Sequence, residues 1–142
     1  MLLCRVGDLY RYMNGLEEEH ADLKSYYLDN AYRSYELAST VDPKFGLAYN
    51  QLGVVSISLG RTTDALYFYC KSYQCDETRQ TAKQNIRGLL SHYHSNLSGS
   101  LLNLLNRIDS TDASKHEAPG EFQKDDISER EKYILLVLNE FE

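Results

Sequence analysis

The cysteines and histidines are the side chains with which this sequence would have to build a metal site or a nucleophilic centre. Cys4, Cys70 and Cys75 form no C-x-x-C pair, and their odd number does not suggest a disulfide framework. His92 and His94 are two residues apart, so on a helix they would face different directions. We therefore expect reduced cysteines in the core and no metal site.

The sequence also lacks the short motifs that organise common catalytic centres. It contains no G-x-S-x-G segment, no Walker phosphate loop and no H-E-x-x-H pair. No cysteine and histidine are arranged as a nucleophile with its base. We expect a protein that is not an enzyme and that uses no cofactor.

Length and composition are those of one globular unit. The chain has 142 residues, of which 42% are hydrophobic and 25% charged, and its formal net charge is −6. No apolar run approaches the roughly 18 residues that cross a bilayer, and no secretory signal is visible. We expect a cytoplasmic protein without a membrane partner, with shuttling to the nucleus as an alternative. The negative charge disfavours broad attachment to nucleic acid but leaves room for a local basic pocket.

An internal repeat organises the first two thirds of the chain. Ala31 and Tyr35 recur as Ala65 and Tyr69 at an offset of 34 residues. A period of this length is typical of helix pairs that stack side by side. The sequence therefore predicts an all-α fold of tetratricopeptide-type antiparallel helix pairs.

The second copy of the repeat shows why these residue types recur. Gly53 and Ala65 lack bulk where two antiparallel helices would approach each other closely. Gly60 can take the left-handed conformation that ends a helix, and Thr63 or Asp64 can cap the next helix. We expect these two helices at about residues 45–59 and 63–75.

The first copy is about 12 residues longer than the repeat length allows. We place this insertion at about residues 14–25. Asn14-Gly15 predicts a turn there, and the acidic run Glu17–Glu19 predicts a solvated face or the start of an extended helix.

Three parts follow from these patterns. The first part is a helical domain at 1–97, the second is a short helix and flexible linker at 98–126, and the third is a C-terminal helix at 127–142. Within the helical domain, we expect repeat 1 at about 3–43, repeat 2 at about 44–77 and a packing helix at about 79–97. Ser128 can cap the last helix, whose apolar run at 133–138 needs a surface to pack on.

One segment carries a more specific signal. Gly7-Asp8-Leu9-Tyr10-Arg11-Tyr12 resembles the G-D-x-x-R-Y segment of 14-3-3 phosphopeptide-binding domains. Further pieces extend the match: Tyr26-Tyr27, Asp42-Pro43, Tyr49-Asn50-Gln51-Leu52-Gly53 and Tyr67-Phe68-Tyr69-Cys70. Together, over about residues 3–94, they resemble the SMG and Est family of nonsense-mediated mRNA decay factors and telomerase-associated proteins. The resemblance implies a 14-3-3-like helical array, of which this chain would be a fragment or truncated form.

The resemblance also implies a binding site. Arg11 and Tyr12 would grip a phosphoserine, while Asn50 would hold the backbone of the bound peptide. The implied partners are phosphorylated tails of the decay helicase and other decay-factor subunits. In the family a further basic residue from an upstream helix completes the phosphate clamp, and Arg5 points too far around its helix to replace it. The acidic insertion would repel a phosphopeptide if it folded over the groove.

Other interpretations of the same residues stay open. Arg11 can be an ordinary surface residue that pairs with Asp8 one turn earlier, and Tyr12 and Asn50 can fill the seam between helices. The whole chain can be a telomerase-associated subunit that binds RNA or telomere proteins. It can also be a tetratricopeptide co-chaperone that captures a C-terminal carboxylate, or a structural piece of a longer chain.

Overall fold

The computed structural model describes residues 1–93, 96–97, 99 and 128–141. In this part of the chain every regular element is helical and no strand occurs, which confirms the predicted all-α fold class. The elements are α1 (Leu2–Leu16), α2 (Ala21–Val41), α3 (Gly46–Ser58), α4 (Thr62–Tyr73), the short 3-10 helix η1 (Asp76–Thr78), α5 (Arg79–His92) and α7 (Glu129–Asn139). None of these helices is long and apolar enough to cross a membrane.

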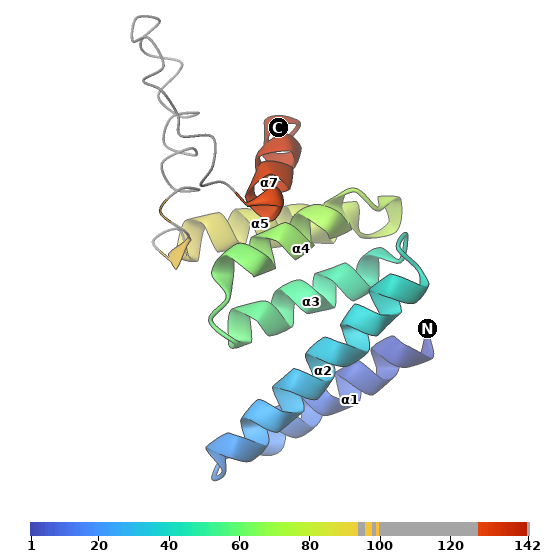
Figure 1. Ribbon diagram of the computed structural model, residues 1–142, viewed down its shortest axis with the longest axis vertical. Coiled ribbons are helices and arrows are strands. Elements are labelled where there is room, and N and C mark those ends of the chain that lie inside the picture. The colour runs from blue at the N-terminus through green and yellow to red at the C-terminus, as the bar shows by residue number, and fades with distance from the viewer. Residues whose placement is uncertain (94–95, 98, 100–127, 142) are drawn as a thin grey trace, which may run out of the picture.

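Consecutive helices pack as antiparallel pairs and form an array. The most extensive contacts join α1 to α2 and α3 to α4, and further contacts join α2 to α3 and α4 to α5. Figure 1 shows the α1–α2 hairpin at one end, α3 and α4 in the middle, and α5 with α7 at the other end. The array is the arrangement that the repeat predicts.

Helix α3 lies at the centre of this array, and its composition reflects that position. It is apolar almost all round because α2 covers one side and α4 covers another. Its buried residues are Gly46, Ala48, Asn50, Leu52, Gly53, Val55 and Ser56. In contrast, α5 buries only the stripe of Ala82, Ile86 and Leu89, and its remaining residues are mostly polar.

Two glycine–tyrosine contacts set the spacing within the helix pairs. A β-carbon added to Gly53 would overlap the ring of Tyr69, and one added to Gly7 would overlap the ring of Tyr35. Tyr35 and Tyr69 are the two tyrosines that recur at an offset of 34 residues. In both helix pairs, therefore, the same kind of contact, a tyrosine ring on a glycine, joins the two helices. Each helix pair can approach closely only because a glycine faces each ring.

The turn between α3 and α4 follows the prediction in part. Gly60 has a φ angle of 73°, the left-handed conformation expected of it. Next to it, the N–H of Arg61 donates to the carbonyl of Ser56 at 2.8 Å and so satisfies one of the last carbonyls of α3. The predicted cap is wrong, because α4 begins at Thr62 after Arg61, without a side-chain hydrogen bond at its cap.

The longer first pair is built differently from the prediction. Asn14-Gly15 forms no turn, since α1 continues to Leu16. The acidic run Glu17–Glu19 starts no helix either but joins α1 to α2. The extra residues instead lengthen the helices: α2 has 21 residues, whereas its counterpart α4 has 12. The acidic loop that contains Glu17–Glu19 therefore lies at the tip of the α1–α2 hairpin and does not fold over α3 (Figure 1).

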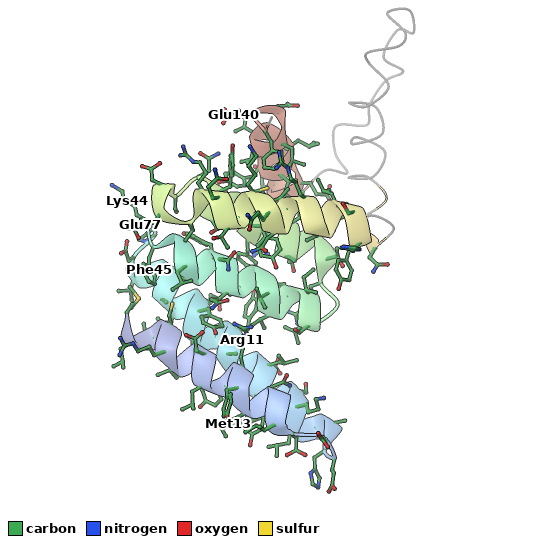
Figure 2. The ribbon with its side chains drawn as sticks, turned by 180° about the vertical axis from the view of Figure 1, so that it is seen from behind. Arg11, Met13, Lys44, Phe45, Glu77 and Glu140 are labelled. Carbon is green, nitrogen blue, oxygen red and sulfur yellow. The ribbon has the colours of Figure 1, made fainter. Side chains whose placement is uncertain are left out.

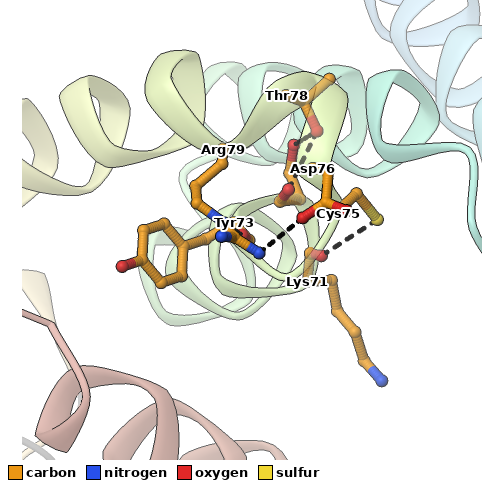
Figure 3. Close-up of polar contacts among 7 residues, drawn as sticks. Lys71, Tyr73, Cys75, Asp76, Thr78 and Arg79 are labelled. Atoms are coloured by element: carbon orange, nitrogen blue, oxygen red, sulfur yellow. Dashed lines mark hydrogen bonds and ion pairs between the residues drawn. The ribbon is translucent and has the colours of Figure 1, made fainter.

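A small polar cluster joins the end of α4 to the start of α5 (Figure 3). The hydroxyl oxygen of Ser72 lies 2.9 Å from both the carbonyl oxygen of Gly46 and the hydroxyl oxygen of Thr78. Thr78 also donates to the carbonyl of Ser72 at 2.9 Å. Arg79 pairs with Asp76 at 2.8 Å on the exposed side. These bonds hold η1 against α3 and fix the direction in which α5 continues from η1.

The last helix, α7, packs against the α4 side of the array. Ser128 caps it as predicted, because its hydroxyl accepts from the N–H of Glu131 at 3.2 Å. Ile134 and Val137 are fully or almost fully buried with α4 and α5 residues such as Leu66. The surface that this apolar helix was expected to need is thus provided by the chain itself. The predicted short helix and linker at 98–126 lie outside the described residues, except for residue 99.

Candidate functional site

Arg11 is the motif residue that contacts α3 from α1. Arg11 lies on the side of α1 that faces α3, as Figure 2 shows. One guanidinium nitrogen, Nη1, donates to the side-chain carbonyl of Gln51 at 3.0 Å. Arg11 is half-buried, so part of its fork of donors remains open to solvent.

The carboxylate of Asp8 forms no ion pair with Arg11. It accepts the hydroxyl hydrogen of Tyr35 at 2.6 Å and a weak bond from the amide of Gln51 at 3.4 Å. Among the ion pairs of the described residues, none joins Arg11 to Asp8. The interpretation of Arg11 as the ion-pair partner of Asp8 is therefore wrong.

Two tyrosine hydroxyls lie within the electrostatic reach of Arg11. Burial raises the pKa of Tyr35, and its hydrogen bond to Asp8 raises that pKa further, while Arg11 acts in the opposite direction. Burial also raises the pKa of Tyr69 to about 12, again against a lowering effect of Arg11. Arg11 therefore interacts with the side chains of Gln51 and Tyr35, both of which also bind the carboxylate of Asp8.

The three residues implied by the resemblance are not brought together as one cluster. Tyr12 is 65% exposed, and its phenol makes no hydrogen bond to the described residues. Asn50 is buried and faces α5, where its side-chain oxygen accepts from the amide of Asn85 at 2.7 Å. Gln51, the residue after Asn50, is the one that reaches Arg11. Sequence reasoning missed Gln51 and Asn85, although Gln51 lies in the Tyr-Asn-Gln-Leu-Gly segment itself.

A shallow cavity lies next to this polar row. It has a volume of about 300 Å³ and is bordered by Tyr69, Asn85, Leu89 and His92, among other residues of α3, α4 and α5. Its walls mix apolar surface with amide groups. The row from Arg11 through Gln51 and Asn50 to Asn85 could therefore receive an extended peptide, with a charged group at the Arg11 end.

The three cysteines were expected in the core, but Cys75 is only partly buried. Cys4, Cys70 and Cys75 are all free thiols, and the first two are buried. Burial raises the pKa of Cys70 to about 12, so this thiol is neutral at physiological pH. No three residues of the metal-binding types gather in the described part of the chain. His94, part of the metal pattern considered above, lies outside the described residues.

The helices define the class of the protein: an α-helical array of antiparallel pairs with a row of polar side chains across α1, α3 and α5. The family described as Est1 DNA/RNA binding domain matches residues 31–139, which is most of the chain. This chain belongs to that family. The match contains Asn50 and Gln51, whereas Arg11 and Tyr12 precede it.

Individual relatives agree with this assignment. The Telomerase-binding protein EST1A of Danio rerio is 30% identical over 90 residues, which cover 62% of this chain and 5% of that protein. The Nonsense-mediated mRNA decay factor SMG5 of Homo sapiens is 32% identical over 87 residues, covering 61% of this chain and 8% of that protein. These two relatives confirm the resemblance to the SMG and Est family.

A third relative is of a different kind. The Small glutamine-rich tetratricopeptide repeat-containing protein 2 of Mycosarcoma maydis is 36% identical over 58 residues, covering 41% of this chain and 16% of that protein. The chain therefore spans only a small part of each of these relatives. No solved structure matches the chain significantly.

Proposed function

We propose that this chain is a non-catalytic adaptor module of the nonsense-mediated mRNA decay type, and that it binds phosphorylated protein tails between α1 and α3. The observation that carries the proposal is the position of Arg11. Its guanidinium is held by Gln51 at 3.0 Å, while the nearby carboxylate of Asp8 is occupied by Tyr35. A guanidinium held by a neutral partner keeps its charge available for a phosphate dianion.

The neighbouring residues have complementary roles in this proposal. Tyr12 is exposed one residue further along α1 and points about 100° around the helix from Arg11, so its phenol can flank a peptide bound at Arg11 but does not converge with Arg11 on one phosphate. The buried Asn50 accepts one hydrogen bond from Asn85, and Asn85, which is only partly buried, keeps further amide groups for the backbone of an extended peptide. The relative named as a decay factor supports the pathway. We propose the cytoplasm as the working compartment, with access to the nucleus.

The test is a titration of a phosphoserine peptide and its unmodified counterpart against the chain and three variants. Arg11→Glu should abolish the preference for the phosphorylated peptide, and Arg11→Lys should reduce it because a lysine lacks the planar fork. Arg5→Glu, an equal charge change at an exposed position of the same helix, should leave the preference intact. Charge-assisted bonds of this kind contribute about 1.5–3 kcal/mol, so the preference should be at least about tenfold. Equal affinity of the unaltered chain for both peptides would remove the proposal.

A telomerase-associated role with RNA as the ligand is the second candidate. The family description and the relative named as a telomerase-binding protein favour it. Filter binding of single-stranded RNA at two salt concentrations separates the two candidates, because RNA binding weakens steeply with salt. Tight, salt-sensitive binding of RNA without any preference for phosphopeptides would favour this second role.

A co-chaperone scaffold is the third candidate, favoured by the relative whose name includes tetratricopeptide repeats. Such a scaffold captures a C-terminal carboxylate with amide and basic side chains. Competition between an acidic chaperone tail and the phosphoserine peptide distinguishes it. Binding of the tail alone would favour the scaffold over the adaptor.

A further inference from the structure

Helix α1 carries a row of apolar side chains that the array leaves uncovered. The row consists of Leu2, Val6, Leu9, Met13 and Leu16, which we call the α1 stripe. These residues are spaced alternately four and three apart, so they lie along one face of the helix. All of them except Met13 are exposed, and Leu9 in the middle of the row is 59% exposed.

The α1 stripe lies opposite the face by which α1 packs on its neighbours. The buried residues of α1 are Cys4 and Gly7. With about 100° between successive residues, these two point in nearly the opposite direction from Leu9 and Met13. Figure 2 agrees, because it shows Arg11 on the α3 side of α1 and Met13 on the other side. The stripe is therefore separate from the proposed phosphopeptide site.

Exposed apolar side chains are concentrated on α1. Of the twelve large hydrophobic side chains that are exposed in the described part of the chain, five belong to the 15 residues of α1. The longer α2, with 21 residues, contributes only three. A surface helix needs one apolar face to pack on its own protein, and a second apolar face marks a contact with another surface.

The two ends of α1 carry opposite charges that are not paired. Arg5 is exposed beside the first half of the α1 stripe, and the loop after the stripe contains the acidic run Glu17–Glu19. Within the described residues, neither Arg5 nor Glu18 nor Glu19 forms an ion pair. The outer side of α1 is therefore positive near its start and negative at its end.

We propose that the α1 stripe is an interface between two copies of this chain, in which the two α1 helices lie antiparallel. A two-fold axis between Leu9 and Met13 would bring each of these residues against the other one of the second copy. Val6 then meets Leu16 of the other copy, and Arg5 lies beside the acidic loop of the other copy. A parallel pair would instead place like charges side by side at both ends.

A second copy fits this surface better than an unrelated helix does. Any apolar helix would cover the stripe, but the charges at the two ends of α1 complement α1 itself. The α1–α2 hairpin forms one end of the array, so a second copy can approach it without meeting α5 or α7 (Figure 1). A helix of 15 residues is only about 22 Å long, so we expect a small interface with a dissociation constant on the order of 10–100 µM.

The experiment is sedimentation equilibrium of the full chain between about 5 and 500 µM, a range that spans the expected dissociation constant. We expect a reversible equilibrium of monomer and dimer. Leu9→Glu, which buries a carboxylate twice at the centre of the interface, should remain monomeric throughout this range. Leu37→Glu is the matched control, since it makes the same kind of change at a position of α2 that is 51% exposed, and it should dimerise normally. Circular dichroism verifies that both variants keep their helices.

A charge exchange tests the antiparallel arrangement. Arg5→Glu should weaken dimerisation about tenfold, because it sets like charges together at both ends of the interface. Adding Glu18→Arg and Glu19→Arg to the same chain should restore the dissociation constant to within about threefold. Failure of this restoration would overturn the arrangement.

Two further results would overturn the proposal as a whole. One is a chain that stays monomeric over the whole range, which would leave the α1 stripe to a helix of another protein. The other is an equal effect of Leu9→Glu and Leu37→Glu. Arg11→Glu alters the opposite side of α1 and should leave dimerisation unchanged, so this proposal and the phosphopeptide site can fail independently.

Discussion

The ring of Tyr69 lies so close to Gly53 that a β-carbon on this glycine would overlap the ring. The ring of Tyr35 has the same relation to Gly7 in the other helix pair. Both glycines are therefore required for the distance between helices, and not for an unusual backbone angle. This relationship leads to the first prediction.

Gly53→Ala should destabilise the protein, because the added methyl group forces the ring of Tyr69 out of a packed position. We expect a loss of about 1–3 kcal/mol in the free energy of unfolding, measured by chemical denaturation. Gly88→Ala is the matched control, since nothing lies within 4 Å of the β-carbon it would add. That change should stabilise α5 by about 0.5–1 kcal/mol. Losses of similar size in both variants would contradict the packing argument.

Tyr35→Phe should remove the hydrogen bond to Asp8 without changing the packing of the ring. We expect a loss of about 1 kcal/mol, because water can replace the hydroxyl at the exposed carboxylate of Asp8. Tyr12→Phe removes the same group from an exposed ring and should change stability by less than about 0.5 kcal/mol. The comparison uses thermal and urea unfolding, and equal effects would show that the bond to Asp8 contributes nothing.

Ile134→Ala should release α7 from the array. Ile134 is fully buried among residues of α4 and α5, so truncation should cost about 2–5 kcal/mol of docking free energy. Leu136→Ala, on the exposed face of the same helix, should be neutral within about 0.5 kcal/mol. Amide hydrogen exchange of α7 is the measurement. Unchanged protection of α7 in Ile134→Ala would refute its packing.

Stability should fall at alkaline pH. Burial raises the pKa of Cys70 from 9.0 to about 12 and that of Tyr69 from 10.0 to about 12. Since the folded pKa values lie above the unfolded ones, the neutral forms stabilise the fold fully below about pH 9, and this contribution is lost as pH rises toward 12. Urea unfolding at pH 8, 10 and 11 measures the decline. In Cys70→Ala the decline between pH 9 and 10 should be smaller, because only Cys4 and Cys75 remain as thiols whose pKa burial raises. An identical profile would contradict the assignment to Cys70.

The helix pairs could be predicted because their causes are local. An alanine and a tyrosine that recur at 34 residues, with Gly53 on the neighbouring helix, indicate two helices that approach closely, and the structure shows a close glycine–tyrosine contact in both copies. The first helix pair does not contain the predicted turn. Asn14-Gly15 favours a turn in isolation, yet the packing of α1 on α2 carries the helix through it to Leu16.

The candidate site was predictable only as a set of residue types. The motif pointed to Arg11, Tyr12 and Asn50 but could not show which of them meet. Adjacent residues on a helix point about 100° apart, so the crossing of α1 over α3 decides that Gln51, and not Asn50, contacts Arg11. The partner of Asn50 is instead Asn85, which lies 35 residues away on α5.

The sequence by itself determined the helical class of the protein, the close approach of two helices at Gly53 and the family, because spacing and side-chain bulk act over short stretches of chain. Tertiary structure alone decided which distant side chains share a surface. It left Arg11 without a carboxylate partner, and it placed Phe141 beside Lys83 and Arg87. Such neighbourhoods depend on how whole helices cross and dock, and no local pattern encodes those angles.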